Sequence, residues 1–393
     1  MKPAIKLGSL LLAIMLVFTA VASGCSLNKE WSYKTSEKEL PIGVYIYCLN
    51  NAYSTAKGYA EKLDDYDPTK DTWLDMEITD DDDNKAVARQ WIKDKAEELC
   101  LTFLVVEEQF KAENATYDEA TLISYQEQAK QYWEVGVEQY GQMVYAALSN
   151  TYAPYGVSLE SFSYCYADTS IKQEALFYAA YGEGGSQEVK DDELEKHFID
   201  NYVSYSYLSA PLYESTTDEA GESTSVALSD DEIKKVKSEF EGYVKQIKDG
   251  KSMDDVAESY KKNNGEDAGD PVSSTEAFDK LSMGDDFKEA LEKLDSKKAT
   301  TITVGEGNSA MLYFIYKDDI KSIAKNYLKD GEQHKAVLAN MKSEDFQDYI
   351  KELIKSLKYE KNSAVDSYDP KMFFEPEEPA TTEAADDSTA DES

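Results

Sequence analysis

The sequence contains few of the residue types that most often carry chemistry. Its 393 residues include two histidines, four cysteines and a single arginine, Arg89, among 41 basic residues. Arginine supplies the planar fork that recognises phosphates and base edges, so its near absence argues against a nucleic acid partner. The formal net charge of -37 argues against it as well, because a phosphate backbone repels an acidic surface. With so few histidines and no CxxC pair, the sequence predicts no metal site and no cofactor.

Only one long apolar run is present, and it lies at the N-terminus. Lys2 and Lys6 precede an apolar stretch at 7–21 that is too short to span a membrane comfortably, and small residues then lead to Cys25. This order predicts a secretory signal over residues 1–24. Small residues directly before a cysteine resemble the lipobox of bacterial lipoproteins, in which the cysteine is acylated and becomes the new N-terminus. The alternative is a plain signal peptide with an incidental cysteine.

The lipobox resemblance implies a location for the mature chain. Cys25 would carry the lipid, with palmitate as a possible acyl chain, and the protein would lie on the outer face of the cytoplasmic membrane. Loss of Lys2 and Lys6 changes the formal charge from -37 to -39. Because so acidic a surface repels anionic lipid headgroups, we expect the lipid to be the sole membrane attachment.

The other three cysteines are Cys48, Cys100 and Cys165, each within an apolar or aromatic helical pattern. An odd number at wide spacing is no disulfide framework. We therefore expect all three to be buried as small hydrophobic residues.

The first half of the chain is predicted to be mostly helical. Residues 25–40 are polar and unpatterned and are expected to be a tether, and a helical domain is expected over 41–200. Apolar residues recur at helical spacing in four stretches, 42–63, 87–110, 117–148 and 158–182, and the third of these holds an apolar face only loosely. The acidic run at 79–85 is expected to lie at the N-terminus of the second helix. A calcium site is the weaker interpretation, since the run lacks the glycine and distal glutamate of an EF-hand.

The middle of the chain has a different pattern. The stretch YVSYSYL at 202–208 alternates with period two, which predicts a strand with Val203, Tyr205 and Tyr207 on one face. Three helices should follow, the first opened by a capping box of Ser229 and Glu232. Two strands joined near Gly305 close this region, with room for one more strand near Phe278. The sequence thus predicts a small α/β insert at 201–319.

After the insert the chain returns to a helical pattern over 320–372. Residues 373–393 are strongly acidic and are expected to form a disordered tail. The predicted class is therefore α+β: one discontinuous, mostly helical domain with the α/β insert looped out of it.

This order resembles the extracytoplasmic foldases of the PrsA and SurA type, over about residues 37–365. In that family a parvulin-like prolyl isomerase domain is inserted in a helical chaperone domain. Two segments carry the resemblance: EGYVKQIKDGKSMDDVAESYKKN at 241–263 and SMGDDFKEALEKL at 282–294. The resemblance implies a chaperone or foldase whose partners are unfolded or newly secreted polypeptides. Whether the chain forms a homodimer is left open.

The resemblance also implies a binding pocket. Met283 and Phe287 stand where parvulins have the methionine and phenylalanine that hold the proline ring; two core residues of an amphipathic helix are the equal alternative. The two parvulin histidines would fall at about Ser206 and Leu312, and the cysteine or aspartate near Asn263. None of these is the expected residue, and His197 and His334 lie outside the insert. Catalytic residues are therefore unknown, and isomerase activity is expected to be weak or lost.

Three other functions stay open at this point. The first is an active prolyl isomerase of the same fold. The second is a solute-binding lipoprotein of an importer, which would need two α/β lobes where the sequence indicates one. The third is a purely structural envelope protein.

Overall fold

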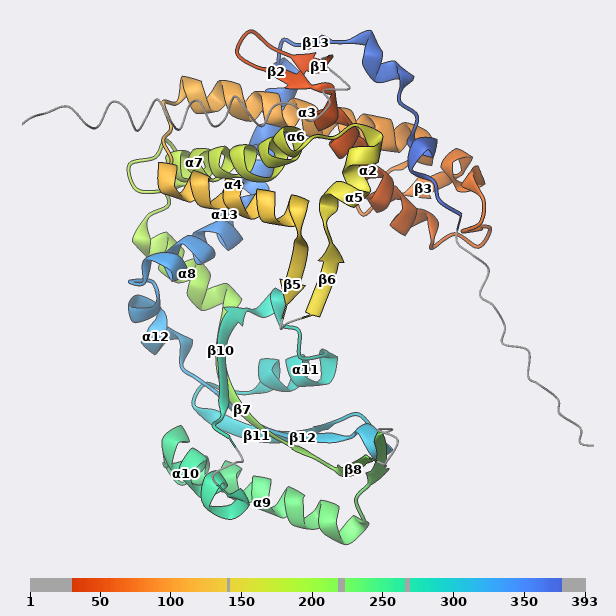
Figure 1. Ribbon diagram of the computed structural model, residues 1–393. Coiled ribbons are helices and arrows are strands. Elements are labelled where there is room, and N and C mark those ends of the chain that lie inside the picture. Colours follow the sequence, from red (N-terminus) through yellow and green to blue (C-terminus); the bar gives the residue numbers. More distant parts are fainter. Residues whose placement is uncertain (1–29, 140–141, 218–222, 266–268, 377–393) are drawn as a thin grey trace, which may run out of the picture. The chain divides into compact units, whose positions relative to one another are not determined.

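The computed structural model describes residues 30–376 except 140–141, 218–222 and 266–268 (Figure 1). Cys25 and the predicted signal therefore lie outside the described residues, as does the tail from 377. The chain divides into two compact units, one made of 1–186 with 345–393 and the other of 187–344. The predicted α+β class is confirmed, since the first unit is mostly helical and the second combines a sheet with helices.

The first unit contains long helices and three small antiparallel sheets. Its helices are α2 (Ile42–Ala60), α3 (Ala88–Ala112), α4 (Glu119–Glu134), α5 (Leu148–Tyr152), α6 (Leu159–Ser163), α7 (Thr169–Tyr181) and the C-terminal part of α13 (Gly331–Ser356). Its strands are β1 (Trp31–Lys34), β2 (Glu39–Pro41), β3 (Glu77–Thr79), β4 (Lys85–Val87), β5 (Gly136–Gln139), β6 (Gln142–Ala146) and β13 (Glu360–Lys361). A π-helical turn, Tyr164–Asp168, joins α6 to α7, and 3-10 turns lie at Asp71–Asp75, Ala153–Tyr155, Ser363–Ser367 and Pro370–Phe373.

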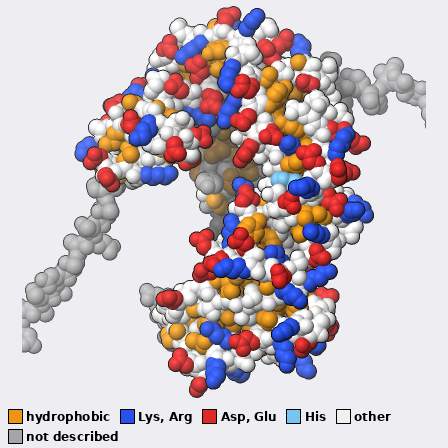
Figure 2. Space-filling model, turned by 180° about the vertical axis from the view of Figure 1, so that it is seen from behind, with side chains coloured by type: hydrophobic (Ala, Val, Ile, Leu, Met, Phe, Trp, Pro, Cys, Tyr) orange, Lys and Arg blue, Asp and Glu red, His pale blue; other side chains and the backbone are white. Residues whose placement is uncertain are grey.

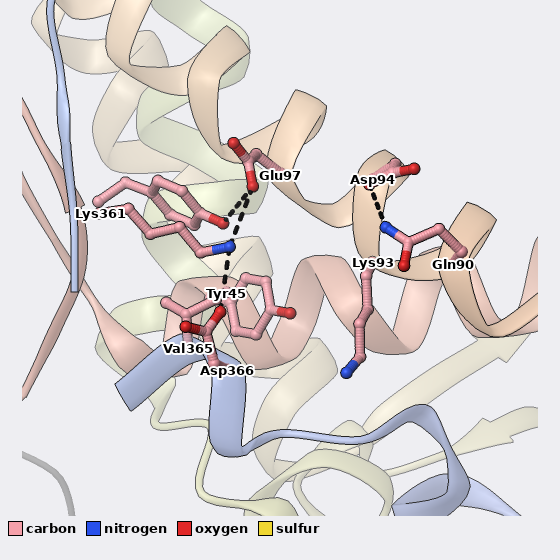
Figure 3. A pocket seen from close by; sticks show the side chains of 9 residues that line it. Tyr45, Gln90, Lys93, Asp94, Glu97, Lys361, Val365 and Asp366 are labelled. Atoms are coloured by element: carbon pink, nitrogen blue, oxygen red, sulfur yellow. Dashed lines mark hydrogen bonds and ion pairs between the residues drawn. The ribbon is translucent and has the colours of Figure 1, made fainter. Parts of the chain in front are cut away.

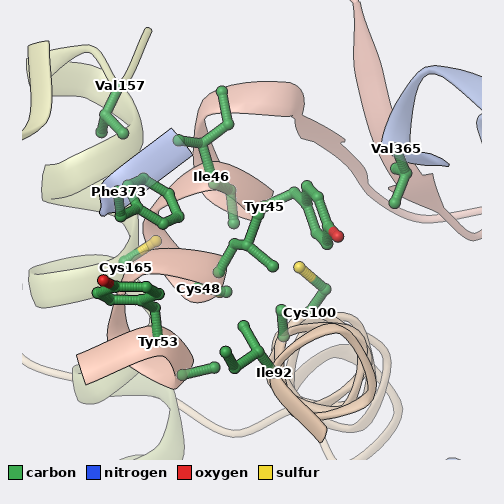
Figure 4. Close-up of a cluster of buried hydrophobic side chains, with 14 of the residues drawn as sticks. Tyr45, Ile46, Cys48, Tyr53, Ile92, Cys100, Val157, Cys165, Val365 and Phe373 are labelled. Carbon is green, nitrogen blue, oxygen red and sulfur yellow. The ribbon is translucent and has the colours of Figure 1, made fainter. Parts of the chain in front are cut away.

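Helix α2 is the centre of this unit. Eleven of its 19 residues are buried, and it contacts α3, α6, β1, β2, β3 and the C-terminal turn at 370–373. A helix that is apolar on most sides has to be covered on most sides, which explains why elements from both ends of the chain lie against it. Figure 4 shows Val365 and Phe373 from the C-terminal segment in the same core as Tyr45 and Ile46.

The three described cysteines lie together in this core. Cys48 of α2, Cys100 of α3 and Cys165 of the π-helical turn are all buried and unbridged (Figure 4). Burial raises the pKa of Cys100 and of Cys165 well above the ordinary thiol value. The expectation of buried small hydrophobic residues is thus confirmed, and at neutral pH Cys100 and Cys165 are thiols rather than thiolates.

Four expectations about the first unit are wrong in part. Part of the expected tether is folded, because β1 and β2 form a sheet with β13 and Tyr33 has no exposed surface. The expected tail begins too early, since Phe373 is buried against Tyr53 and Tyr155. Both short segments are polar in sequence apart from one or two aromatic residues, and those residues fix them to α2.

The other two corrections concern predicted helical regions. The helix expected over 117–148 ends at Glu134, and a β-hairpin of β5 and β6 follows Gly136, whose φ of 102° lies outside the helical region. The acidic run at 79–85 is the turn of the β3–β4 hairpin and not a helix N-terminus. The Asp80 carboxylate accepts hydrogen bonds from the amides of Asp82 and Asn84, at 3.1 and 2.8 Å, and so closes this turn.

The second unit is built on one four-stranded antiparallel sheet. Its strands are β7 (Tyr202–Pro211), β10 (Val272–Ala277), β11 (Lys298–Val304) and β12 (Met311–Lys317), in the order β10-β7-β12-β11, and a separate hairpin is formed by β8 (Tyr213–Thr217) and β9 (Ser223–Ala227). Its helices are α8 (Asp191–Asn201), α9 (Asp230–Lys248), α10 (Met253–Asn264), α11 (Asp285–Lys293), α12 (Ile320–Tyr327) and the start of α13. The capping box of Ser229 and Glu232 is present at the start of α9, as predicted.

This unit is larger than the insert expected at 201–319. Helices α8 and α12 belong to it, because the Phe198 ring of α8 stacks on the Tyr327 ring of α12 with centroids 4.7 Å apart. Phe198 also contacts Tyr202 at the start of β7. The two helices that flank the sheet in sequence therefore pack on each other and on the sheet. The second unit accordingly begins at 187 instead of 201 and ends at 344 instead of 319.

Charged side chains of both signs are interspersed over the visible surface, with apolar side chains scattered between them (Figure 2). No helix within the described ranges is both long enough and apolar enough to cross a bilayer.

Candidate functional site

The strand β7 places the candidate site, since it lies between β10 and β12 and both of its faces are covered (Figure 1). On one face Val203, Tyr205 and Tyr207 point toward α11, which agrees with the predicted grouping. On the other face Leu208 lies in a cluster with residues of α9 and α10. Successive side chains of a strand point to opposite faces, so each residue of β7 is committed to one helix layer or the other.

Helix α11 brings the predicted pocket residues to the first face. Gly284, with φ of 79°, precedes the helix, and Asp285 and Asp286 occupy its first turn, where carboxylates interact favourably with the helix dipole. Phe287 and Leu291 follow at a spacing of four residues and turn the same side of the helix toward the sheet. Met283 lies just before the helix at the edge of the same cluster.

Phe287 is surrounded by tyrosine rings. Its ring centroid lies 5.6 Å from that of Tyr205, 5.8 Å from Tyr207 and 5.6 Å from Tyr313, with steep interplanar angles of 61°, 80° and 87°. These are edge-to-face contacts of the kind that stabilise aromatic clusters. Phe287 is 0% exposed, whereas Tyr207, Tyr313 and Met283 are half-buried. A ligand on this face would therefore touch the tyrosines and Met283, with Phe287 supporting them from below.

The hydroxyl groups of these tyrosines differ in their surroundings. Tyr205 donates a hydrogen bond to Glu276 of β10 at 2.8 Å, and burial together with this bond raises the pKa of Tyr205. Tyr207 and Tyr313 have no hydrogen-bond partner for their hydroxyls among the described residues. Burial, followed by the neighbouring Tyr207 and Tyr213, raises the pKa of Tyr313. The Tyr313 phenol is therefore protonated at neutral pH, and both hydroxyls are available to a ligand as hydrogen-bonding groups.

The positions expected for the parvulin histidines lie on the opposite face of the sheet. Leu312 packs in the cluster with α9 and α10, and the Ser206 hydroxyl is hydrogen-bonded to that of Ser273 at 2.8 Å. Asn263 of α10 donates to the Tyr243 hydroxyl at 3.2 Å, again in the α9–α10 layer. The positions that the parvulin resemblance implies for the histidines therefore do not lie on the face that carries Phe287. A shift of one residue along a strand moves a side chain to the other side of the sheet, so a small error in the expected positions is enough to change the face.

Sequence reasoning missed Tyr207 and Tyr313 as site residues. They lie on neighbouring strands with ring centroids 5.8 Å apart, on the face that carries Phe287. The grouping of Tyr207 with Val203 and Tyr205 was available from the period-two pattern. What the sequence did not supply was the face of the sheet on which α11 packs.

The two histidines lie away from this face. His197 of α8 is hydrogen-bonded to Asn340 at 2.9 Å and to Asn201 at 3.1 Å, so it is a paired structural residue rather than a solvated one. His334 lines a surface depression of about 380 Å³ together with Leu194 and Leu328. Across the described ranges there is no group of three or more His, Cys, Asp or Glu side chains that could hold a metal ion.

Comparisons with known proteins give structural matches at low scores. No protein-family model matches the chain, and no curated protein matches it. Among solved structures, the foldase protein PrsA from Streptococcus pneumoniae is 15% identical, with a TM-score of 0.35 over 76% of this chain and 100% of that one. PrsA from Bacillus subtilis is 15% identical, with a TM-score of 0.28 over 72% of this chain and 94% of that one. At these scores the matches carry no argument about function.

The packing of Phe287 leads to a prediction about stability. Phe287→Ala should lower the free energy of unfolding of the second unit by about 3–5 kcal/mol, because it leaves a cavity beneath three rings. Tyr207→Phe and Tyr313→Phe keep the rings and remove hydroxyls without protein partners, so each should change it by no more than about 0.5 kcal/mol. Urea unfolding followed by far-ultraviolet circular dichroism measures these changes.

The chain offers an internal control for this experiment. All four tryptophans, Trp31, Trp73, Trp91 and Trp133, belong to the first unit. The tryptophan fluorescence transition should therefore be the same in Phe287→Ala and wild type. A loss below about 1 kcal/mol would show that Phe287 is not packed as described.

Proposed function

We propose that this chain is a membrane-anchored extracytoplasmic chaperone that binds unfolded or newly exported polypeptides. The observation that carries the proposal is the aromatic face of the second unit, defined as Tyr207, Tyr313 and Met283 over the buried Phe287. The resemblance of segments 241–263 and 282–294 to foldases supports it from the sequence.

The chemistry of the aromatic face suits a polypeptide of variable sequence. A tyrosine ring offers apolar contact area at a small cost in side-chain entropy, and its hydroxyl can bond to a backbone amide or carbonyl. Methionine adapts to differently shaped partners. None of these groups requires a fixed charge or a particular side chain on the polypeptide, so the face would accept many clients.

The same face argues for weak or absent prolyl isomerase activity. Catalysis must lower a rotational barrier of about 18–20 kcal/mol, which requires a site that favours the twisted amide over the planar one. Here Phe287 is shielded by tyrosines, and both histidines lie on helices outside the sheet. We therefore assign the chain a holding role and treat an active isomerase as the alternative.

The N-terminal sequence supports the location. The signal at 1–24 and Cys25 would direct the chain across the cytoplasmic membrane and attach it by a lipid. The acidic composition would keep the rest of the chain off an anionic lipid surface, so that it stays available to clients.

Client binding is tested with a chemically unfolded protein diluted into buffer. The wild-type chain should suppress its aggregation, measured by light scattering, at an equimolar ratio. Tyr207→Ser combined with Tyr313→Ser should bind a labelled unfolded peptide at least about tenfold more weakly, since both rings of the contact surface are lost.

A matched control is available on the same strand. Tyr316 of β12 is half-buried on the opposite face, near α9, so Tyr316→Ser should leave client binding unchanged. The chaperone proposal fails if wild type shows no suppression. The assignment to the aromatic face fails if the double variant and Tyr316→Ser behave alike.

Isomerase activity is tested with a proline peptide in a protease-coupled assay. The uncatalysed exchange takes about 10–100 s, and the wild-type chain should leave this time nearly unchanged. An acceleration that disappears in the double tyrosine variant but persists in Tyr316→Ser would establish the active isomerase instead.

Lipid attachment is tested in cells by fractionation and fatty-acid labelling. Cys25→Ala should abolish labelling and move the chain from the membrane fraction to the soluble or secreted fraction, because no other anchor is expected. Ser26→Ala serves as the neighbouring control and should stay in the membrane fraction. Retention of Cys25→Ala at the membrane would contradict the sole-anchor proposal.

A further inference from the structure

A polar cavity of about 240 Å³ lies in the first unit, separate from the aromatic face (Figure 3). Four side chains of α3 line it at helical spacing: Gln90, Lys93, Asp94 and Glu97. Tyr33 of β1, Tyr45 of α2 and three residues of the C-terminal segment, Lys361, Val365 and Asp366, complete the wall. The space is more than a single water requires and less than the roughly 300 Å³ of a pocket for a drug-sized ligand.

One wall of the cavity is internally paired. The Glu97 carboxylate accepts hydrogen bonds from the hydroxyls of Tyr33 and Tyr359, both at 3.0 Å, and lies 3.3 Å from the Lys361 ammonium. Lys361 also forms an ion pair with Asp366 at 3.2 Å. Burial, then the charge of Glu97, raises the pKa of Tyr33, so its hydroxyl stays a donor. These groups need no ligand to satisfy them.

Two donors in the cavity are not paired. Tyr45 is only 1% exposed, yet its hydroxyl has no hydrogen-bond partner among the described residues. Burial raises the pKa of Tyr45, which keeps the phenol protonated. The half-buried Lys93 ammonium likewise has no ion-pair or hydrogen-bond partner within the described part of the chain. In Figure 3 both groups point into the same part of the cavity, away from the Glu97 pairs.

A hydroxyl and an ammonium that face a cavity without a protein partner are free to donate to a ligand in place of water. An ammonium and a phenol together are suitable donors for a carboxylate. The remaining charges limit what that carboxylate can belong to. Asp94, Glu97 and Asp366 outnumber Lys93 and Lys361, so the cavity repels a ligand of net negative charge and favours one that also carries an ammonium group.

We propose that this cavity binds a small zwitterion, either a free amino acid or a short peptide. Its carboxylate is bound by Lys93 and Tyr45, and its ammonium group lies toward Asp366 or Asp94. Gln90 donates its amide to Asp94 at 2.8 Å and keeps its own oxygen available as a further acceptor. The site is independent of the aromatic face and of the chaperone proposal.

The test uses the full chain and named probes in isothermal titration calorimetry and thermal melting. L-Alanine, L-glutamate, L-lysine and dialanine represent free amino acids and a peptide, while acetate and ethylammonium carry one charge each. At least one zwitterion should bind and raise the melting temperature, and acetate and ethylammonium should bind at least about tenfold more weakly. Comparison of the amino acids with dialanine distinguishes a site for free amino acids from a site for short peptides.

Two variants remove one donor each and keep the side-chain volume. Lys93→Met and Tyr45→Phe should each weaken binding about tenfold or more, the scale of a lost hydrogen bond to a charged group. Lys95→Met is the matched control, because Lys95 pairs with Glu98 at 2.8 Å outside the cavity. The proposal is overturned if no zwitterion in the panel binds at millimolar concentration, or if Lys93→Met binds as Lys95→Met does.

Discussion

The second unit depends on the alternation of side chains along β7. This strand is central in its sheet, and buried side chains on both faces commit it to two different helix layers. A shift of one residue would bring Ser204 and Ser206 under Phe287 and turn Tyr205 and Tyr207 toward α9. The aromatic face therefore depends on this register. A shift of one residue in either direction would place serine hydroxyls among the apolar side chains around Phe287, which costs free energy and so disfavours the shifted pairing.

Much of the fold follows from the sequence, and the failures have a common cause. Regular periodicity over ten or more residues identified the helices α2, α3 and α9, and two shorter runs on either side of Gly305 identified the strand pair β11–β12. Short segments were misjudged: β1 and β2 lie in a polar stretch and Phe373 lies beside an acidic one, and the packing of their few apolar side chains in the α2 core decides their structure. The β5–β6 hairpin was missed because its tyrosines and glutamines fit a loose helical pattern as well as an alternating one, and Gly136 was the one local signal against it.

The sequence predicted two residues of the candidate site, but it missed Tyr207 and Tyr313 and did not predict the geometry. The sequence singled out Met283 and Phe287, and both lie in the cluster on the α11 face. It could not show that Phe287 would be fully covered, since coverage depends on rings from β7 and β12 that are far apart in sequence. Nor could the sequence show on which side of the sheet each side chain of β7 and β12 lies. That assignment needs the pairing register, in which Ile315 lies opposite Tyr207 and Phe314 opposite Leu208.

The cavity of the first unit depends on segments from both ends of the chain. Lys361 and Asp366 reach α3 because β13 pairs with β1 and because Val365 and Phe373 are buried in the α2 core. Arg89 adds ion pairs with Asp75 and Asp369, but these groups are partly exposed, and such pairs contribute little stability. The burial of Val365 and Phe373 is therefore the main interaction that holds the C-terminal segment against α2. A zwitterion bound between Lys93, Tyr45 and Asp366 would add a link between α3 and that segment, and it would stabilise the docked state by an amount that grows with the logarithm of ligand concentration above the Kd.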